Sequence, residues 1–206
     1  MMLKVFVFLI LLFSLTFSCS REEKQIGVLD IAGNVVRKDG EPAAGFTLTD
    51  QNGKKVSLKD FQGKLVLINF IYTNCKGTCP PLILKFKEIQ LDLKDEFKKQ
   101  TALLSVSFDY ERDTPEVLKK FSELQRADLS FWTFLTGSQA EIDKVLQDYQ
   151  VAVKKGPDGE FGHINMVVMI DKDGKRRYDF FGYDYPTEKI IERIHEVLKK
   201  RWLWQG

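Results

Sequence analysis

The amino-acid sequence predicts an α/β fold in which helices cover both faces of a central mixed sheet. From residue 64 onward, short apolar runs typical of buried strands alternate with segments whose apolar residues recur every three or four positions, as in helices. A hairpin pattern precedes this alternation, and a second hairpin followed by a helix ends it. The 206 residues, of which 44% are hydrophobic, can bury the core of one domain of roughly 150 to 170 residues.

The first predicted elements are a β-hairpin, a strand and a long helix. Residues 46–48 and 56–58 alternate in polarity around the turn sequence Asp50-Gln-Asn-Gly53, which indicates the hairpin. The near-continuous apolar run over residues 64–72 is typical of a buried strand. Beyond it, large apolar residues at spacings of 4, 3, 4 and 4 predict one face of a single helix: Leu82, Phe86, Ile89, Leu93 and Phe97.

Two more pairs of strand and helix follow, and then the closing hairpin and helix. Residues 102–108 and 131–135 are apolar enough for core strands. A Thr-Pro pair at residues 114–115 marks the start of one helix, and the sequence Ser-Gln-Ala-Glu over residues 138–141 forms a capping box at the start of the next. The closing strands and helix are predicted over residues 165–170, 176–181 and 187–202.

The charged residues give no reason to expect nucleic acid as a partner. Lysine and arginine together number 31 and aspartate and glutamate 29, so the formal charge is +2, and the basic residues are spread among acids along the predicted helices. A protein that binds phosphate groups typically concentrates its basic residues on one face. We therefore expect no nucleic-acid partner, and we expect the domain to be a monomer.

The N-terminal residues have the pattern of a bacterial export signal. Lys4 precedes the apolar run of residues 5–13, which is short for a membrane span and has the length of a signal-peptide core. Residues 16–19, Thr-Phe-Ser-Cys, resemble a lipobox, whose cysteine is lipid-modified and becomes the new N-terminus. An uncleaved N-terminal anchor helix is the alternative interpretation.

These patterns predict three segments along the chain. We expect residues 1–18 to be a lipoprotein-type signal peptide, Cys19 to carry the lipid, and residues 19–40 to form a polar membrane tether. Residues 41–206 then form the folded domain. The protein is expected to be anchored to a membrane on the extracytoplasmic (periplasmic) side of a bacterium.

Two cysteines at a predicted strand-to-helix junction are the chemical centre of the sequence. Cys75 and Cys79 are the only cysteines beyond Cys19. A disulfide between them would close a very short loop and add little stability, so we expect a chemical role, either as a redox-active disulfide or as ligands for a soft metal. In α/β sheets the functional loops lie at the carboxyl ends of strands, where these cysteines fall. This order of elements, with cysteines after the first long strand, is a thioredoxin-like arrangement.

A family resemblance rests on five motifs: Phe46-Thr-Leu-Thr-Asp-Gln-Asn-Gly53, Phe61-Gln-Gly-Lys64, Phe70-Ile-Tyr-Thr-Asn-Cys75 with Cys79-Pro80, Ser107-Phe-Asp-Tyr-Glu-Arg-Asp-Thr-Pro-Glu116, and His163 before a strand. Together they resemble the Sco/SenC family of copper-binding, thioredoxin-fold proteins, which are implicated in maturing the copper centre of cytochrome oxidase. The similarity runs from about Phe46 to the last helix. Tyr110, where the family usually has proline, and the setting of the histidine in Phe161-Gly-His163 depart from the family pattern.

The resemblance implies a ligand set, a cofactor and a partner. The family's metal ligands fall on Cys75, Cys79 and His163, its cofactor is copper, as Cu(I) or Cu(II), and its partner is the cytochrome oxidase subunit that carries the copper centre. The chemistry of the residues agrees, because Cu(I) prefers thiolates and Cu(II) readily adds imidazole. Cys79 begins a predicted helix, where free backbone N–H groups and the helix dipole favour the thiolate. The topology brings the glycine-rich loop before His163 beside the end of the first long strand.

A few other residues could serve this site. Asp109 follows a core strand and could lie near the thiols and tune them, whereas Asp113 is expected to be a turn or cap residue for the helix that follows. Met166 and Met169 offer soft sulfur atoms, but their position in a core strand predicts packing. His195 is expected on the solvated side or rim of the last helix.

Two functions of different classes fit these residues. The first is a membrane-tethered copper chaperone that delivers copper to an oxidase subunit and is not an enzyme. The second is a thiol-disulfide oxidoreductase that keeps the copper-ligand cysteines of the target reduced. Thiol-disulfide enzymes of the thioredoxin type use a C-x-x-C motif and a cis-proline, and this sequence has neither feature, so the chaperone is favoured.

Overall fold

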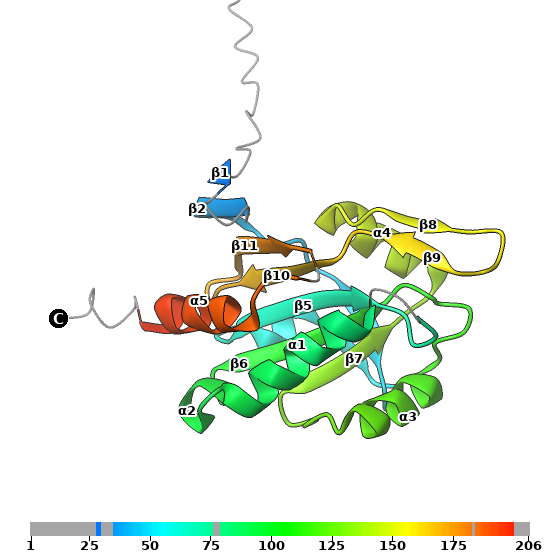
Figure 1. The fold of residues 1–206 in the computed structure, drawn as a ribbon, viewed down its shortest axis with the longest axis horizontal. Coiled ribbons are helices and arrows are strands. Elements are labelled where there is room, and N and C mark those ends of the chain that lie inside the picture. The colour runs from blue at the N-terminus through cyan, green and yellow to red at the C-terminus, as the bar shows by residue number, and fades with distance from the viewer. Residues whose placement is uncertain (1–27, 30–34, 76–78, 183, 200–206) are drawn as a thin grey trace, which may run out of the picture.

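The computed structural model describes residues 28–29, 35–75, 79–182 and 184–199 (Figure 1). Nine strands form one sheet in the order β1-β2-β11-β10-β5-β6-β7-β3-β4, and two short strands, β8 and β9, form a separate sheet. The strands of the large sheet are β1 (Val28–Leu29), β2 (Val35–Pro42), β3 (Thr47–Asp50), β4 (Lys55–Ser57), β5 (Leu65–Ile71), β6 (Thr101–Ser107), β7 (Trp132–Thr136), β10 (Met166–Ile170) and β11 (Lys175–Phe181).

Three parallel strands form the centre of this sheet. β5 pairs with β6 along its whole length, from Leu65 opposite Thr101 to Ile71 opposite Ser107, and β6 pairs with β7. All residues of β5 and β6 are buried, which explains why both strands are near-continuous apolar runs in the sequence. The remaining pairs are antiparallel, so the prediction of a mixed sheet is confirmed.

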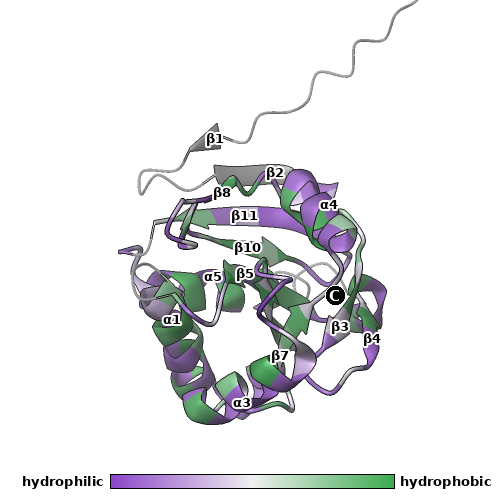
Figure 2. Ribbon diagram, turned by 90° about the vertical axis from the view of Figure 1, so that its right-hand side faces the viewer, coloured by the Kyte–Doolittle hydropathy of each residue, from purple (hydrophilic) through white to green (hydrophobic). Residues whose placement is uncertain are grey.

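The helices lie on both faces of the sheet. They are α1 (Cys79–Asp92), α2 (Asp95–Lys98), α3 (Pro115–Gln125), α4 (Gln139–Tyr149) and α5 (Thr187–Lys199), with a short 3-10 turn over Leu58–Phe61. Right-handed crossovers from β5 to β6 and from β6 to β7 place α1 and α3 on one face, and the return from β7 to β10 places α4 on the other. α5 packs beside α1. Figure 2 shows the hydrophobic residues of β5, β7 and β10 between these helix layers.

Local signals in the sequence set the starts of two helices as predicted. The Thr114 hydroxyl accepts a hydrogen bond from the backbone N–H of Val117, with Pro115 at the first helical position. Ser138 and Glu141 form the predicted capping box, in which the Ser138 backbone N–H donates to the Glu141 carboxylate at 2.7 Å. The predicted hairpins are also present, as β3 with β4 and β10 with β11.

The prediction of one helix that includes Leu93 and Phe97 is wrong. α1 ends at Asp92, and Lys94 has an extended backbone (φ −61°, ψ 149°) before α2 begins. Leu93 is still buried and Phe97 packs against the core. The apolar spacing therefore continues across a break in the backbone, which periodicity alone could not detect.

The structure also contains strands that the sequence analysis did not predict. β2 pairs with β11, and β1 pairs with β2, so part of the segment that we assigned to a polar tether lies in the sheet. The glycine-rich loop before His163 is a hairpin, in which β8 (Val153–Lys155) pairs with β9 (Phe161–His163). The predicted signal peptide and Cys19 lie outside the described residues, as does the end of the last predicted helix beyond Lys199.

Candidate metal centre

Three side chains that the sequence analysis singled out meet at one point of the structure. The ligand atoms of Cys75, Cys79 and His163 all lie within 4.8 Å of one another. The Cys79 Sγ lies 3.3 Å from His163 Nε2, and the Cys79 backbone N–H donates to the Cys75 Sγ at 3.2 Å. Within the described part of the chain, the two cysteines are not joined by a disulfide. Two sulfur atoms and one imidazole nitrogen are a donor set suited to copper in either oxidation state.

Each of the three residues comes from a different kind of element. Cys75 follows β5 at the carboxyl end of the parallel strands, and Cys79 is the first residue of α1. His163 ends β9, in the separate two-stranded sheet. Figure 1 shows β9 near the end of β5 from which the cysteine segment leaves. The strand-to-helix junction thus places two ligands and the hairpin supplies the third.

The two cysteines differ in exposure. Cys79 is 2% exposed, whereas Cys75 is half-buried and is the more accessible thiol. Burial raises the pKa of the Cys79 thiol, and its hydrogen bond with Cys75 raises it further. Burial therefore opposes the stabilisation of the Cys79 thiolate that we expected from the start of α1. A metal ion that binds Cys79 must displace this proton.

His163 is held as a neutral ligand. Burial lowers its pKa, so the imidazole is uncharged at pH 7. Its Nδ1 lies 3.2 Å from the carbonyl oxygen of Ile164, and because a carbonyl can only accept, Nδ1 carries the hydrogen and donates it. The lone pair of the neutral ring then resides on Nε2, the atom that faces the Cys79 sulfur.

Aromatic side chains that immediately follow β5 and β6, and one from β9, surround the imidazole. The ring of Phe108 lies 4.9 Å from that of His163, and the ring of Tyr72 lies 6.3 Å from it, measured between centroids. Phe161 packs against both of these residues, at 5.1 Å from Tyr72 and 5.4 Å from Phe108. Tyr72 and Phe108 are each less than 4% exposed. These three aromatic rings restrict water on one side of the ligands and fix the orientation of the His163 imidazole.

Polar contacts attach the β8–β9 hairpin to the rest of the protein. The Tyr72 hydroxyl donates to the Glu160 carboxylate at 2.7 Å and accepts from the backbone N–H of Phe161. Burial and the bond to Glu160 raise the pKa of Tyr72, so the hydroxyl stays protonated. Arg112 donates to the carbonyl oxygen of Gly159 at 3.1 Å and lies over the Phe161 ring. These contacts position His163 from outside its own sheet.

Of the two aspartates after β6, Asp113 is the one that contacts the cysteine loop. Its carboxylate accepts hydrogen bonds from the Thr73 backbone N–H at 2.9 Å, from the Thr73 hydroxyl at 2.6 Å and from the Ser107 hydroxyl at 2.5 Å. Thr73 stands two residues before Cys75. Asp109 is also buried, but its carboxylate forms an ion pair with Arg112, which in turn donates to the hairpin. The sequence analysis had favoured Asp109 for tuning the thiols.

The residues that we expected to lie outside the site do so. Met166 and Met169 are at most 1% exposed in the core strand β10. His195 lies on α5, where its ring packs 4.4 Å from that of Phe97. His195 does not belong to the cluster of ligand atoms around Cys75 among the described residues.

A family model described as SCO1/SenC matches residues 36–199, which is most of the chain. The chain belongs to the SCO1/SenC family. The "SCO1 protein homolog" of Bacillus subtilis (strain 168) is 37% identical over 154 residues, which cover 72% of this chain and 79% of that protein. The resemblance in the sequence motifs is thus confirmed.

Solved structures of this family share the fold. A SCO1/SenC family lipoprotein from Bacillus anthracis str. Ames is 33% identical, with a TM-score of 0.72 over 80% of this chain and 99% of the other. ScoI of Bradyrhizobium japonicum, solved with copper bound, is 31% identical, with a TM-score of 0.66 over 76% and 99%. BsSco, described as a Sco family cytochrome c oxidase assembly protein with a disulfide switch, is 32% identical, with a TM-score of 0.68 over 80% and 98%. The thioredoxin-like α/β fold is confirmed.

Among the described residues, no helix is both long enough and apolar enough to cross a bilayer.

Proposed function

We propose that this protein is a copper carrier, in which Cys75, Cys79 and His163 bind one copper ion for delivery to the copper centre of a cytochrome oxidase subunit. The observation that carries the proposal is the convergence of two sulfur atoms and one imidazole nitrogen within 4.8 Å. Relatives support it, because one is solved with copper bound and another is described as a cytochrome c oxidase assembly protein. Copper is the cargo here, so binding must be tight but reversible.

We propose a different part for each ligand in binding and release, which the geometry supports. Cys75, the more exposed sulfur, is placed to meet the incoming ion and to exchange it with an acceptor. Cys79 loses its proton to solvent when copper binds, so that the thiolate replaces the S–H group. His163 is already neutral and its Nε2 lone pair points at the sulfur, so it adds to the ion without releasing a proton. Two thiolates satisfy Cu(I), and the imidazole favours Cu(II).

Copper-to-protein stoichiometry of the reduced full chain tests this proposal. We expect one copper per protein, and we expect Cys75→Ser or Cys79→Ser to abolish tight binding while the fold is kept. His163→Ala should cost Cu(II) affinity heavily and Cu(I) affinity less, because two thiolates remain. His195→Ala is the matched control, since it removes the other histidine and should leave one copper bound. Full retention of copper in either cysteine variant would contradict the proposed site.

A second candidate function is thiol-disulfide exchange with the target. It is favoured by the accessible Cys75 thiol beside Cys79 and by the disulfide switch described for a relative. In this reaction the Cys75 thiolate attacks a target disulfide, and Cys79 then displaces the target thiol. The target gains two electrons and two thiols while the Cys75–Cys79 disulfide forms.

The variant His163→Ala separates the two functions. It should still exchange its dithiol with a model disulfide, because exchange needs only the two cysteines. Loss of copper delivery to a copper-free oxidase fragment, with exchange intact, supports the carrier. Normal maturation of the oxidase by this variant would show that thiol reduction is the essential role.

We also propose that the protein is held at a membrane through lipid on Cys19. The lipobox-like residues before Cys19 motivate this, and a relative of the same family is described as a lipoprotein. Mass spectrometry of the membrane-bound protein is the test. A modified N-terminal Cys19 is expected, and Cys19→Ala should release or mis-process the protein; an intact Met1 would rule out lipidation.

A further inference from the structure

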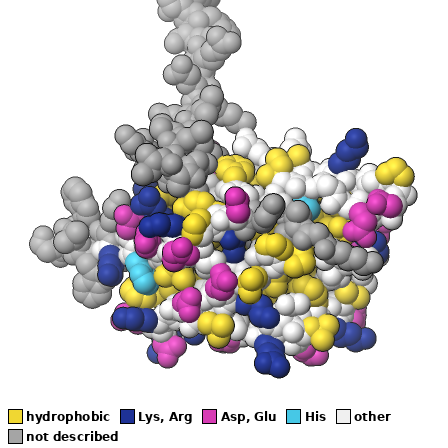
Figure 3. Space-filling view, viewed as in Figure 1, with side chains coloured by type: hydrophobic (Ala, Val, Ile, Leu, Met, Phe, Trp, Pro, Cys, Tyr) yellow, Lys and Arg dark blue, Asp and Glu magenta, His cyan; other side chains and the backbone are white. Residues whose placement is uncertain are grey.

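A surface hollow of about 390 Å³ adjoins the candidate metal centre between α1 and α3. Both sulfur ligands, Cys75 and Cys79, line one end of it. Ile83 and Leu84 of α1 and Phe121 of α3 supply apolar walls. Figure 3 shows hydrophobic side chains reaching the surface over α1 and α3, with basic side chains among them.

This hollow gives a partner access to the metal ligands. Cys79 is 2% exposed and His163 is packed against aromatic rings, whereas Cys75 is the more accessible ligand. A donor atom that lies in the hollow therefore approaches the two sulfur atoms directly. Transfer of an ion between two proteins requires such an approach, because the acceptor's ligand must bind before the carrier's last ligand leaves.

Three side chains of the hollow favour a bound peptide segment. Leu84 is 53% exposed and lines the hollow, so it offers apolar surface to a bound segment beside the thiols. Lys87, further along α1, also lines the hollow, is half-buried, and forms no ion pair with any residue in the described part of the chain. An ammonium group in this setting favours a carboxylate from outside the protein. Gln125 of α3 faces the same hollow and can hydrogen-bond to an extended backbone.

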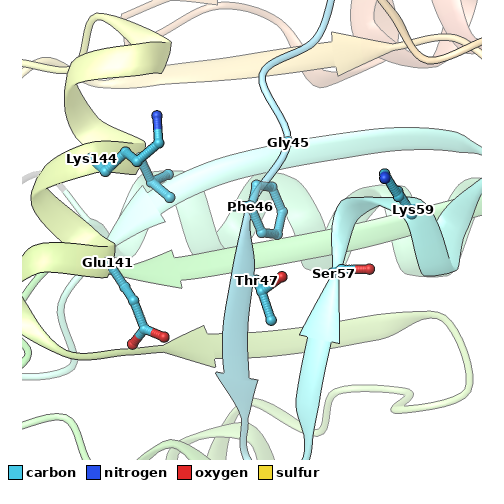
Figure 4. A pocket seen from close by; sticks show the side chains of 8 residues that line it. Gly45, Phe46, Thr47, Ser57, Lys59, Glu141 and Lys144 are labelled. Carbon is cyan, nitrogen blue, oxygen red and sulfur yellow. The ribbon is translucent and has the colours of Figure 1, made fainter.

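A second hollow of similar size provides a contrast. It has a volume of about 410 Å³ and lies between α4 and the β3–β4 hairpin, as Figure 4 shows. Its Lys144 already pairs with Asp148, and its Glu141 already pairs with Lys55. No metal ligand lines it. Its Lys59, like Lys87, forms no ion pair in the described part of the chain, so the hollow beside Cys75 differs in placing such a lysine next to both thiols.

We propose that the hollow between α1 and α3 is the docking groove for an extended segment of the copper acceptor. The segment places a sulfur-bearing ligand side chain at Cys75 and a carboxylate at Lys87. This inference rests on the proposed function, because it names the chemistry of the acceptor at the same site. The backbone N–H of Cys79 lies 3.2 Å from the Cys75 sulfur, so Cys79 marks the height of that sulfur on α1. Cys79 and Lys87 are eight residues apart, which corresponds to about 12 Å along the helix axis. An extended chain advances about 3.3 Å per residue, so the carboxylate stands about three or four residues from the ligand.

Labelled peptides test this groove on the full chain without copper. The probe is an extended eight-residue peptide with serine at the ligand position and glutamate four residues away. A second peptide has lysine in place of the glutamate. Each peptide is also made with its sequence reversed, so that both chain directions in the groove are tested. Fluorescence anisotropy at low salt measures binding to the reduced, copper-free protein. We expect the glutamate peptide to bind roughly fivefold more tightly than the lysine peptide, as one partly exposed ion pair allows.

Variants on the same helices complete the experiment. Lys87→Glu should reverse the preference between the two peptides, and Leu84→Asp should weaken both. The controls are Lys120→Glu on α3 and Leu91→Asp on α1, which carry the same changes at exposed positions outside the groove and should alter neither affinity. Equal binding of the two peptides to the native chain would overturn the groove, as would an effect of Lys120→Glu as large as that of Lys87→Glu.

Copper stoichiometry, measured on the same preparations, separates this inference from the proposed function. Copper binding by the native chain without any peptide preference overturns the groove and leaves the carrier standing. Peptide preference without copper binding overturns the carrier, and the groove then stands as a site for an acidic peptide.

Discussion

Replacing Asp113 with alanine removes the acceptor of three hydrogen bonds that hold the chain just before Cys75. The carboxylate and Ser107 are fully buried, and Thr73 is half-buried. In the alanine variant the Ser107 hydroxyl and the Thr73 backbone N–H lose their partner, and each unsatisfied buried group costs about 1 to 3 kcal/mol. Removing a desolvated carboxylate offsets part of this cost. We expect a net loss of about 2 to 4 kcal/mol in the free energy of unfolding.

The variant Asp113→Asn is the matched comparison. Its amide oxygen can accept from Ser107 and from the Thr73 N–H, and its NH₂ group can donate to the Thr73 hydroxyl, which rotates to accept. The number of hydrogen bonds is then unchanged, and we expect a loss of about 1 kcal/mol or less. Because Thr73 stands two residues before Cys75, the alanine variant should also bind copper more weakly than the asparagine variant.

Urea unfolding of the reduced, copper-free full chain, followed by tryptophan fluorescence, measures both changes. In thermal unfolding, the loss expected for the alanine variant corresponds to a melting temperature about 5 to 15 °C lower for a protein of this size. The reasoning is refuted if alanine costs under 1 kcal/mol, or if asparagine costs as much as alanine. The pH gives a further check, because burial raises the pKa of Asp113. The stabilisation that the Asp113 carboxyl provides is therefore present below its unfolded pKa, near 4, and is lost as pH rises through its folded pKa. Asp113→Asn should remove this dependence of the free energy of unfolding on pH.

Three further predictions follow from the site and from α5. Tyr72→Phe removes the hydroxyl that donates to Glu160, so the β8–β9 hairpin is held less firmly. Cu(II) affinity should then fall about threefold to tenfold, with little change in Cu(I) affinity. Competition with a chelator measures both affinities, and equal losses would contradict the prediction. Copper affinity should rise about tenfold per pH unit for each proton displaced between pH 6 and 8, because burial raises the pKa of Cys79; an affinity independent of pH would be the contrary result. Burial lowers the pKa of His195, so its contribution to stability is present above pH about 6.5 and lost as pH falls. His195→Gln should therefore lose less stability than the native chain between pH 7 and pH 5 in urea unfolding.

The sequence predicted those parts of the fold that depend on local chemistry. The caps at Thr114 and Ser138 fixed two helix starts, and the apolar run over residues 64–72 contained β5. The break between α1 and α2 could not be predicted from spacing, because Leu93 stays in the core on either side of it. β2 depends on pairing with β11, more than a hundred residues away in the chain, and no local pattern reports such a partner.

For the site too, the sequence predicted the residues that local patterns indicate and missed a contact between distant parts of the chain. The cysteine spacing at the end of a strand indicated two ligands, and the topology indicated the third. The choice between Asp109 and Asp113 could not be made from the sequence, because both follow the same strand. It depends on which carboxylate faces Thr73 across the gap between β5 and β6, a property of the folded sheet.

The separate attachment of His163 suits the proposed copper carrier, which has to hold an ion and release it. β8 and β9 pair only with each other within the described sheets, so no ladder hydrogen bond joins them to the nine-stranded sheet. The bond between Tyr72 and Glu160 and the bond from Arg112 to Gly159 attach the hairpin instead. The number of ligands can therefore change between two and three at the cost of a few side-chain contacts, whereas moving Cys75 or Cys79 would disturb β5 or α1. Weakening the hairpin contacts should for this reason affect the ion that needs the imidazole, Cu(II), more than the ion that two thiolates can hold.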